Sequence, residues 1–185
     1  MKNKTLIIWC LILASCLNKK TAKENYTDYI TNPAHGILKQ IKVNNTDITV
    51  QYIPGAYNLI LAKRNGEEAD STAYKSNLYF KITLSNKDFT PDVKAVEYLS
   101  FSMQQDFYLT SGNLTRYPLI CQKIENGRTG QAEYMLVFAA GENAEKTLGD
   151  FELVYTDKIF GTGQQQFRFS GTDIRKIPPV KLNQG

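Results

Sequence analysis

The strict alternation of apolar and polar side chains over residues 77–84 constrains the fold more than any other feature of the sequence. Leu78, Phe80, Ile82 and Leu84 occupy every second position of this segment. Successive side chains of a β-strand point to opposite faces, so these four fall on one face of an extended chain. The segment is therefore predicted to be a half-buried strand.

Further strand-like segments follow at the short spacing that is typical of an all-β domain. They are expected at residues 37–43, 46–53, 95–103, 107–110, 117–124, 132–139, 151–156 and 166–169. Asn44 and Asn45 suit a two-residue turn between the first two segments. We therefore predict one all-β domain over residues 36–185, a two-layer β-sandwich of about seven to nine strands. An immunoglobulin-like or related Greek-key arrangement is expected, with a closed barrel as the alternative.

Residues 54–64 interrupt this strand pattern and leave two alternatives open. Pro54 begins the segment, and Lys63 and Arg64 end it just before Asn65 and Gly66. A proline at the start and basic residues near the end favour one short helix, which would cover an open end of the sandwich. The same residues fit another strand in a hairpin equally well.

The first residues of the chain are those of a secretory signal peptide. A basic start, residues 1–4, precedes the apolar run at residues 5–14, and that run is shorter than the roughly 20 residues that span a bilayer. It ends in Leu13-Ala14-Ser15-Cys16. Residues 1–15 are therefore predicted to be cleaved.

These four residues resemble the lipobox of bacterial lipoproteins, in which a leucine and two small residues precede an invariant cysteine. The resemblance implies that the Cys16 thiol receives a diacylglyceryl group, that cleavage occurs before Cys16, and that its amine is then acylated. Two or three acyl chains hold a protein firmly at a membrane, because each buried methylene contributes about 0.8 kcal/mol. An ordinary signal peptide with an incidental Cys16 is the alternative.

Residues 16–35 are polar, lack regular apolar spacing and are predicted to form a flexible tether. In lipoproteins the residues after the cysteine influence sorting. Leu17 is not the aspartate that favours inner-membrane retention, and Lys19 and Lys20 stand where surface-exported lipoproteins of Bacteroidota carry acidic residues. The resemblance thus implies an outer-membrane lipoprotein that faces the periplasm, with surface exposure as the alternative.

Charge and cysteine content exclude some classes of function. The chain has 22 basic and 18 acidic residues, and cleavage of the signal peptide leaves 20 basic residues because Lys2 and Lys4 are lost. This near-neutral balance gives no basis for nucleic-acid binding. With Cys16 lipidated, Cys121 is the remaining cysteine of the mature chain, and its apolar neighbours predict a buried, unreactive thiol.

Catalytic, metal-binding and cofactor-binding motifs do not emerge from the sequence. His35 is the single histidine, and no G-x-S-x-G motif supports a hydrolase triad. Two glycines at residues 160–164 lack the Lys-Ser/Thr pair of a phosphate loop, and the acidic residues 67–72 lack the ligand spacing of a calcium loop. We therefore expect no enzyme, metal or cofactor. Asp70-Ser71-Thr72 also resembles the O-glycan acceptor motif of periplasmic Bacteroidota proteins, which implies modification at Ser71 or Thr72.

Aromatic residues give the remaining indication of function. The chain has 11 Tyr and 9 Phe, and several tyrosines fall near expected loop or strand ends: Tyr26, Tyr29, Tyr57, Tyr74, Tyr108, Tyr117 and Tyr134. Tyrosine suits protein interfaces and sugar rings, although core packing explains the same residues. Residues 168–181 are expected to form an edge strand and an extended tail. Such an exposed edge can recruit a partner strand, although Pro178 and Pro179 equally serve to stop aggregation.

Residues 17–185 resemble the many small immunoglobulin-like lipoproteins of unknown function in Bacteroidota, from which no site can be transferred. We expect a non-enzymatic envelope lipoprotein that binds another protein, as an accessory or assembly factor of an outer-membrane or secretion complex. A lipoprotein that binds a glycan or small ligand for nutrient capture is the alternative, and a tethered hydrolase is a third.

Overall fold

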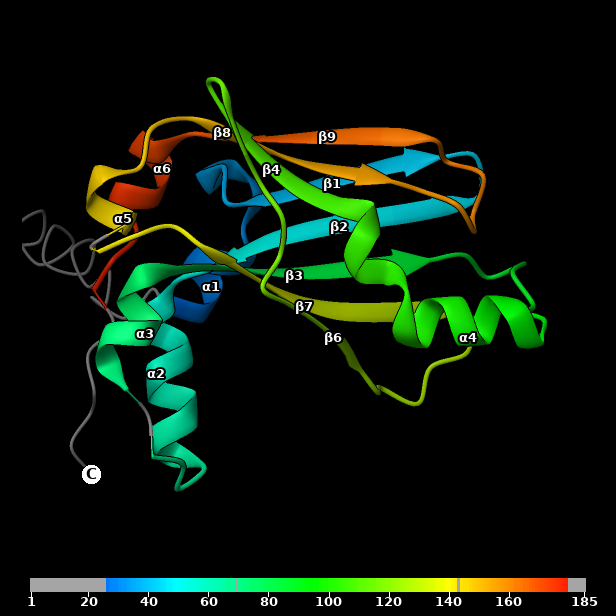
Figure 1. The fold of residues 1–185 in the computed structure, drawn as a ribbon, viewed down its shortest axis with the longest axis horizontal. Coiled ribbons are helices and arrows are strands. Elements are labelled where there is room, and N and C mark those ends of the chain that lie inside the picture. Colours follow the sequence, from blue (N-terminus) through cyan, green and yellow to red (C-terminus); the bar gives the residue numbers. More distant parts are fainter. Residues whose placement is uncertain (1–25, 69, 143, 180–185) are drawn as a thin grey trace, which may run out of the picture.

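The chain is mostly β-structure, arranged as two antiparallel sheets with a few short helices (Figure 1). It was analysed as a computed structural model, which describes residues 26–179 except 69 and 143. Within these residues the first sheet has the order β1 (Leu38–Val43), β2 (Thr46–Ile53), β3 (Asn77–Ser85), β7 (Gln131–Ala139) and β6 (Ile120–Ile124). The second has the order β5 (Leu114–Arg116), β4 (Phe107–Ser111), β8 (Phe151–Thr156) and β9 (Gln164–Phe169).

The two sheets pack against each other through one hydrophobic core. Phe80 of β3 lies at its centre, and its ring centroid is 5.9 Å from that of Phe151 in β8 and 5.5 Å from that of Phe169 in β9. The alternation in β3 is confirmed, because its four apolar side chains at positions 78–84 are at most 1% exposed. The two-layer arrangement predicted from the sequence is thus supported, with nine strands in the described residues.

The turn predicted at Asn44 and Asn45 joins β1 to β2, with Val43 paired to Thr46. Asn44 has a φ of 53°, in the left-handed region that asparagine tolerates better than most residues. The short polar side chain therefore fixes the register of the first hairpin.

The segment with two alternatives is a helix, α2 (Gly55–Arg64), and not a strand. Ile60 and Ala62 are buried, and Lys63 and Arg64 occupy its last turn. Gly55 is required at the start, because a Cβ there would collide with the backbone carbonyl oxygen of Tyr74. Close packing of α2 on the segment before β3 thus selects the helix.

The strand expected at residues 95–103 is wrong. This region forms helix α4 (Val93–Phe101) and the 3₁₀ turn η3 (Met103–Asp106). The Asp92 carboxylate accepts a 2.7 Å hydrogen bond from the backbone N–H of Ala95, which caps the helix. Leu99 and Met103, four residues apart, are buried on one side, as a helical turn requires.

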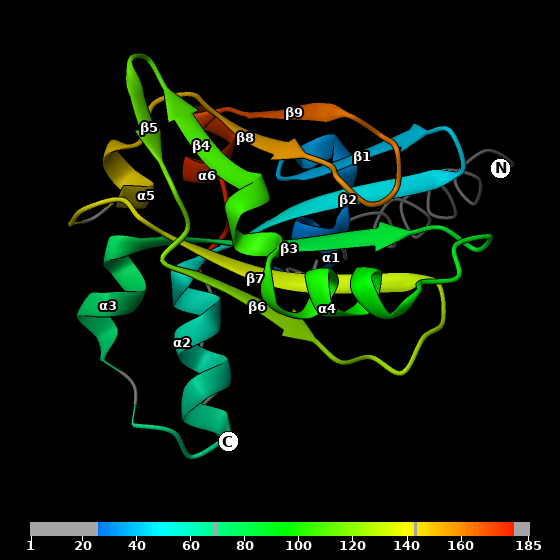
Figure 2. The same cartoon turned by 45° about the vertical axis from the view of Figure 1, so that its right-hand side comes forward.

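Short helices gather at the end of the molecule opposite α4 (Figures 1 and 2). They are α2, α3 (Ser71–Ser76), α5 (Ala144–Thr147) and α6 (Gly171–Arg175). The fold begins before residue 36, because α1 (Tyr26–Thr31) and η2 (Pro33–His35) occupy part of the expected tether. Ile30 is 4% exposed in the core, and the Gln51 side chain donates a 2.9 Å hydrogen bond to its carbonyl oxygen. The tether prediction therefore fails for residues 26–35.

The structure differs from the sequence prediction at β5, at the start of β6 and after β9. Strand β5 was not anticipated, and the segment expected at 117–124 pairs only from Ile120 onward, after Pro118. The extended tail expected after β9 instead turns into α6, which the Ser170 hydroxyl caps by accepting from the Thr172 N–H. The signal peptide, the lipobox and Cys16 lie outside the described residues. Over residues 26–179, no helix reaches the length and apolarity that a membrane span needs.

Candidate functional site

Large apolar side chains are exposed at the end of α4 and on the segment just before β6, and we call Phe101, Tyr117 and Leu119 the α4–β6 surface. Their exposed fractions are 84%, 67% and 58%. The Gln104 amide donates a 2.8 Å hydrogen bond to the Pro118 carbonyl oxygen, which ties η3 to the segment that carries Tyr117 and Leu119. The segment after α4 and the segment before β6 are thus held next to each other.

The backbone holds the segment that carries Tyr117 and Leu119 at the edge of the first sheet. β6 is an edge strand and pairs with β7. Just before it, the Leu119 N–H donates a 2.7 Å hydrogen bond to the Val137 carbonyl oxygen, which fixes the segment in place. Cys121 packs against the core, so Ile120, which is 50% exposed, projects from the opposite face of the sheet and is not part of the α4–β6 surface. Large apolar side chains that stay exposed close together mark interaction sites more often than scattered ones do.

A second candidate is a hollow of about 170 Å³ at the helical end of the molecule. α1, the start of α2, α5, α6 and residues 177–179 supply its walls. Glu145 of α5 lies at this site, and its Oε1 accepts hydrogen bonds from the Tyr52 hydroxyl at 2.9 Å and from the Gly55 N–H at 2.8 Å. One carboxylate thus joins α5 to the end of β2 and the start of α2.

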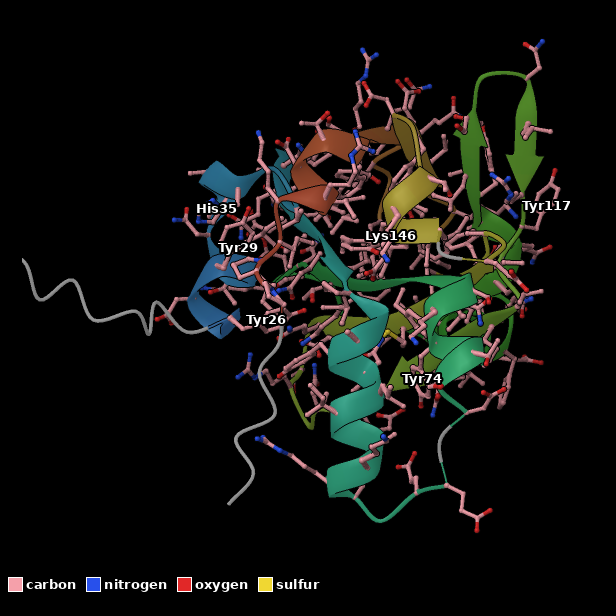
Figure 3. The ribbon with its side chains drawn as sticks, turned by 90° about the vertical axis from the view of Figure 1, so that its left-hand side faces the viewer. Tyr26, Tyr29, His35, Tyr74, Tyr117 and Lys146 are labelled. Carbon is pink, nitrogen blue, oxygen red and sulfur yellow. The ribbon has the colours of Figure 1, made fainter. Side chains whose placement is uncertain are left out.

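Tyr26, which lines this hollow, carries a buried hydroxyl. Its ring stacks on that of Tyr57, with centroids 5.0 Å apart, while its hydroxyl oxygen is buried and has no hydrogen-bond partner within the described chain. Burial, with a further contribution from the charge of Glu145, raises the pKa of Tyr26 above its ordinary value. The hydroxyl therefore stays protonated and is a hydrogen-bond donor. Figure 3 shows Tyr26 and Lys146 on this end of the molecule.

Two carboxylates elsewhere, one buried and one half-buried, already have several partners within the fold. Asp106 is 1% exposed; it accepts hydrogen bonds from the Tyr98 hydroxyl at 2.7 and 2.8 Å and forms an ion pair with Lys158 at 2.8 Å. The half-buried Asp157 accepts from the backbone N–H groups of Ile159, Phe160 and Thr162 and from the Thr162 hydroxyl. This turn accounts for the glycines at 161 and 163. Both carboxylates fix loops.

The tyrosines singled out in the sequence do not form one site. Tyr134 is buried, and its hydroxyl donates to the Leu99 carbonyl oxygen at 2.7 Å. Tyr29 stacks on His35 with centroids 3.7 Å apart, and Tyr74 stacks on Tyr79. Figure 3 shows Tyr29, Tyr74 and Tyr117 at separate places on the molecule. Of the seven, Tyr117 belongs to the α4–β6 surface and Tyr26 to the hollow.

The remaining candidates have local roles. Cys121 is partly buried, and burial raises the pKa of its thiol to about 12. The Asp70 carboxylate accepts a 2.8 Å hydrogen bond from the Thr72 N–H and caps α3. Glycosylation at Ser71 or Thr72 remains a prediction. In residues 26–179, apart from the two gaps, no group of three or more His, Cys, Asp or Glu residues is placed to hold a metal ion.

Sequence reasoning singled out Tyr117 and Tyr26 but missed the other residues that build the two candidates. Phe101 lies in the segment taken for a strand, and the hollow joins Tyr26, Glu145 and Arg175, which are distant in sequence. The Asp92 cap three residues before Ala95 was the one local pattern that could have identified α4 and so the position of Phe101.

Comparison with known proteins gives only distant structural likenesses. No family model and no curated protein matches the chain. A DUF4426 family protein from Pseudomonas aeruginosa PAO1 is similar over 72% of this chain and 91% of its own, with 10% identity and a TM-score of 0.37. A protein of unknown function from Burkholderia pseudomallei K96243 is similar over 82% and 86%, with 12% identity and a TM-score of 0.41.

Proposed function

We propose that the chain is a membrane-tethered envelope lipoprotein whose β-domain binds another protein through the α4–β6 surface. The observation that carries this proposal is the exposure of Phe101, Tyr117 and Leu119 on segments that hydrogen bonds of Gln104 and Leu119 hold in place. Burying apolar area contributes about 25 cal/mol per Å², and aromatic residues dominate binding energy at protein interfaces. The partner we envisage belongs to an outer-membrane or secretion complex.

A binding role suits the polar groups better than a catalytic one. Asp106 and Asp157 are each satisfied by several donors within the fold. Catalytic carboxylates instead need an oxygen that faces substrate with a pKa suited to proton transfer. We therefore propose a non-enzymatic protein.

The strand order supports an immunoglobulin-like assignment of the domain. In the sandwich of that family, strands A-B-E-D form one sheet and C-F-G the other, with additional strands beside C in some types. Here β2-β3-β7-β6 and β4-β8-β9 follow the same order, with β5 beside β4 and β1 added to the outer edge. Immunoglobulin-like domains serve many functions, so the assignment does not identify the partner.

Photo-crosslinking in living cells tests the proposed surface. A photoreactive phenylalanine analogue replaces Phe101 or Tyr117 in separate variants, and a matched control carries it at Arg168, an exposed residue of β9 at the far edge of the second sheet. We expect one crosslinked species from both surface positions and none from the control. Crosslinks of equal yield at all three positions, or none at all, would contradict the proposal.

Metabolic labelling tests the anchor separately. A fatty-acid analogue should label the protein, and Cys16→Ala should abolish this labelling. Cys121→Ala is the matched control, because the thiol at 121 packs within the domain and should not affect lipidation. Labelling that persists in Cys16→Ala would refute lipid attachment at this residue.

The hollow at the helical end favours the second candidate function, binding of a small ligand. Its volume of about 170 Å³ is close to the roughly 150 Å³ of an apolar cavity that holds benzene, and below the roughly 300 Å³ of pockets for drug-sized ligands. The hollow is open on one side, and a ligand or part of a ligand of about ten heavy atoms fits within it.

A further inference from the structure

Among the edge strands of the described residues, β6 is the one most open to pairing with another chain. The two sheets end in β1 and β6 and in β5 and β9. β1 and β9 lie beside each other, because the Asn44 side chain donates a 3.2 Å hydrogen bond to the Gly161 carbonyl oxygen and Lys39 Nζ is 5.6 Å from the ring centroid of Phe169. β5 has three residues, whereas β6 has five and forms the lower margin of the first sheet in Figure 2.

The composition of β6 gives this edge little protection. Edge strands commonly carry an unpaired charge or a proline, which prevents pairing with another chain. The sequence of β6, ICQKI, contains no proline, and its single charge, on Lys123, forms a 3.1 Å ion pair with Glu125. Every second residue of an edge strand directs its N–H and C=O groups away from the neighbouring strand. β6 therefore presents backbone groups to which a further strand can bind.

The side chains of β6 are arranged symmetrically about its middle residue. Ile120 and Ile124 lie two residues before and two residues after Gln122. Because Cys121 packs against the core, these three side chains project from the outer face of the first sheet, where Ile120 is 50% exposed and Gln122 is exposed. Twofold-symmetric dimers use the same surface on both copies, so the surface must be complementary to itself. The apolar positions of β6 satisfy this condition for antiparallel pairing.

Directly opposite side chains select one register for this pairing. A twofold axis through Gln122 sets Ile120 of each copy against Ile124 of the other, which gives two apolar pairs. An axis through Lys123 would set two lysines against each other, and an axis through Cys121 would set each Ile120 against a glutamine. We propose that two copies of this chain associate by antiparallel pairing of their β6 strands about an axis through Gln122.

The expected dimer is weak, because its interface is small. A stable interface of standard size buries about 800 Å² on each partner, and the edge of a five-residue strand buries less. The proposed lipid anchor would favour the dimer, since two copies in one membrane meet at a raised effective concentration. The dimer goes beyond the proposed function, which assigns a different protein to Phe101, Tyr117 and Leu119.

Disulfide crosslinking of the full chain in detergent tests the pairing and its axis. Directly opposite residues of antiparallel strands have Cα atoms about 4.5–5.5 Å apart, which is within the range of a disulfide. In a Cys121→Ser background, Gln122→Cys should form a disulfide-linked dimer on mild oxidation. Gln166→Cys is the matched control, because Gln166 is an exposed glutamine within the edge strand β9. We expect a yield at least about tenfold higher from position 122, and equal yields would overturn the proposal.

A pair of charge substitutions tests the register. Ile120→Lys places a lysine opposite Ile124 of the other copy and should lower the disulfide yield of the Gln122→Cys chain by about threefold or more. Adding Ile124→Glu should restore the yield to within about twofold, because the new lysine and glutamate face each other across the dimer. Within one chain the two residues are about 13 Å apart, so they do not pair. Failure of the second substitution to restore the yield would refute the axis through Gln122.

Sedimentation equilibrium of the unsubstituted full chain in density-matched detergent provides a second measurement. The average mass of the protein should rise from monomer toward dimer as its concentration increases, and a monomer at every concentration would contradict the proposal. Photo-crosslinking from Phe101 separates this inference from the proposed function. A chain that captures a different protein from Phe101 but forms no disulfide at position 122 would refute the dimer alone. A disulfide-linked dimer without any crosslink from Phe101 would support the dimer and refute the proposed function alone.

Discussion

Replacement of Phe80 by leucine should reveal how strongly the two sheets depend on a single ring. Phe80 is completely buried and contacts four aromatic rings, those of Tyr52, Phe138, Phe151 and Phe169, with centroids 5.5 to 5.9 Å away. Leucine keeps most of the apolar transfer energy and loses the aromatic contacts. Each such pair contributes about 0.5–1.5 kcal/mol, so the loss of four pairs should lower the free energy of unfolding by about 2–6 kcal/mol.

Equilibrium unfolding in urea, followed by far-UV circular dichroism, measures this loss. The midpoint should fall while the slope stays unchanged, which indicates lower stability without a change in the surface exposed on unfolding. Phe101→Leu is the matched control, because that ring is 84% exposed and its loss should change stability by less than about 0.5 kcal/mol. If Phe80→Leu were as stable as the control, the two sheets would not share the core described above.

Three further predictions concern single residues. Burial acts to raise the pKa of Asp157, but the backbone N–H groups that donate to its carboxylate outweigh this and lower the pKa below 3.8. The ionised Asp157 therefore stabilises the fold above a pH of about 4, and this contribution is lost as the pH falls through its folded-state pKa. Asp157→Asn should thus weaken the loss of stability toward low pH, measured by urea unfolding between pH 2 and 7. The same loss of stability in the variant and the parent chain would contradict this role of Asp157. Because burial raises the pKa of the Cys121 thiol to about 12, a thiol reagent at pH 8 should label Cys121 only after unfolding in urea. Cys121→Ser serves as the blank. Rapid labelling of the folded protein would contradict the burial of this thiol. Gly55→Ala should lower the free energy of unfolding, measured in urea, by about 2 kcal/mol or more, because the new methyl group collides with the Tyr74 carbonyl oxygen. Gly149→Ala is the control and should be nearly neutral, because a methyl group there points into open space. Equal effects of the two substitutions would refute the steric argument.

Alternation in the sequence identified the strands of the core well. β2 and β3 lie beside each other in the first sheet, and their apolar positions face the core, so a period of two was directly visible. Turn chemistry at Asn44 and Asn45 was equally reliable, because it depends on local backbone conformation. Strand alternation and turn conformation each depend on a few neighbouring residues, so the sequence alone reveals them.

The helices were less visible for a physical reason. α4 has valines at positions 93 and 96, which favour strands. The Asp92 cap and the tertiary packing of Leu99 stabilise a helix there instead. α5 and α6 have only four and five residues, so they carry little periodic pattern. Tertiary contacts, and not local propensity, stabilise such short helices.

The candidate sites were beyond the reach of local patterns for the same reason. Exposure of Phe101 follows from which side of α4 packs on the core, and the hollow exists because α1, α5 and α6 meet. Glu145 illustrates the point, since its partners Tyr52 and Gly55 lie about 90 residues earlier in the chain. Only the folded chain brings these groups together.

The position of Tyr26 at the helical end sets a maximum distance from the proposed lipid anchor. About ten residues separate Cys16 from Tyr26, and a fully extended chain spans at most about 3.6 Å per residue. If Cys16 carries the proposed lipid, Tyr26 and the hollow that it lines lie within roughly 36 Å of the anchor, which is about the width of a small domain. The α4–β6 surface, toward the other end of the molecule, would then be free to extend further from the membrane.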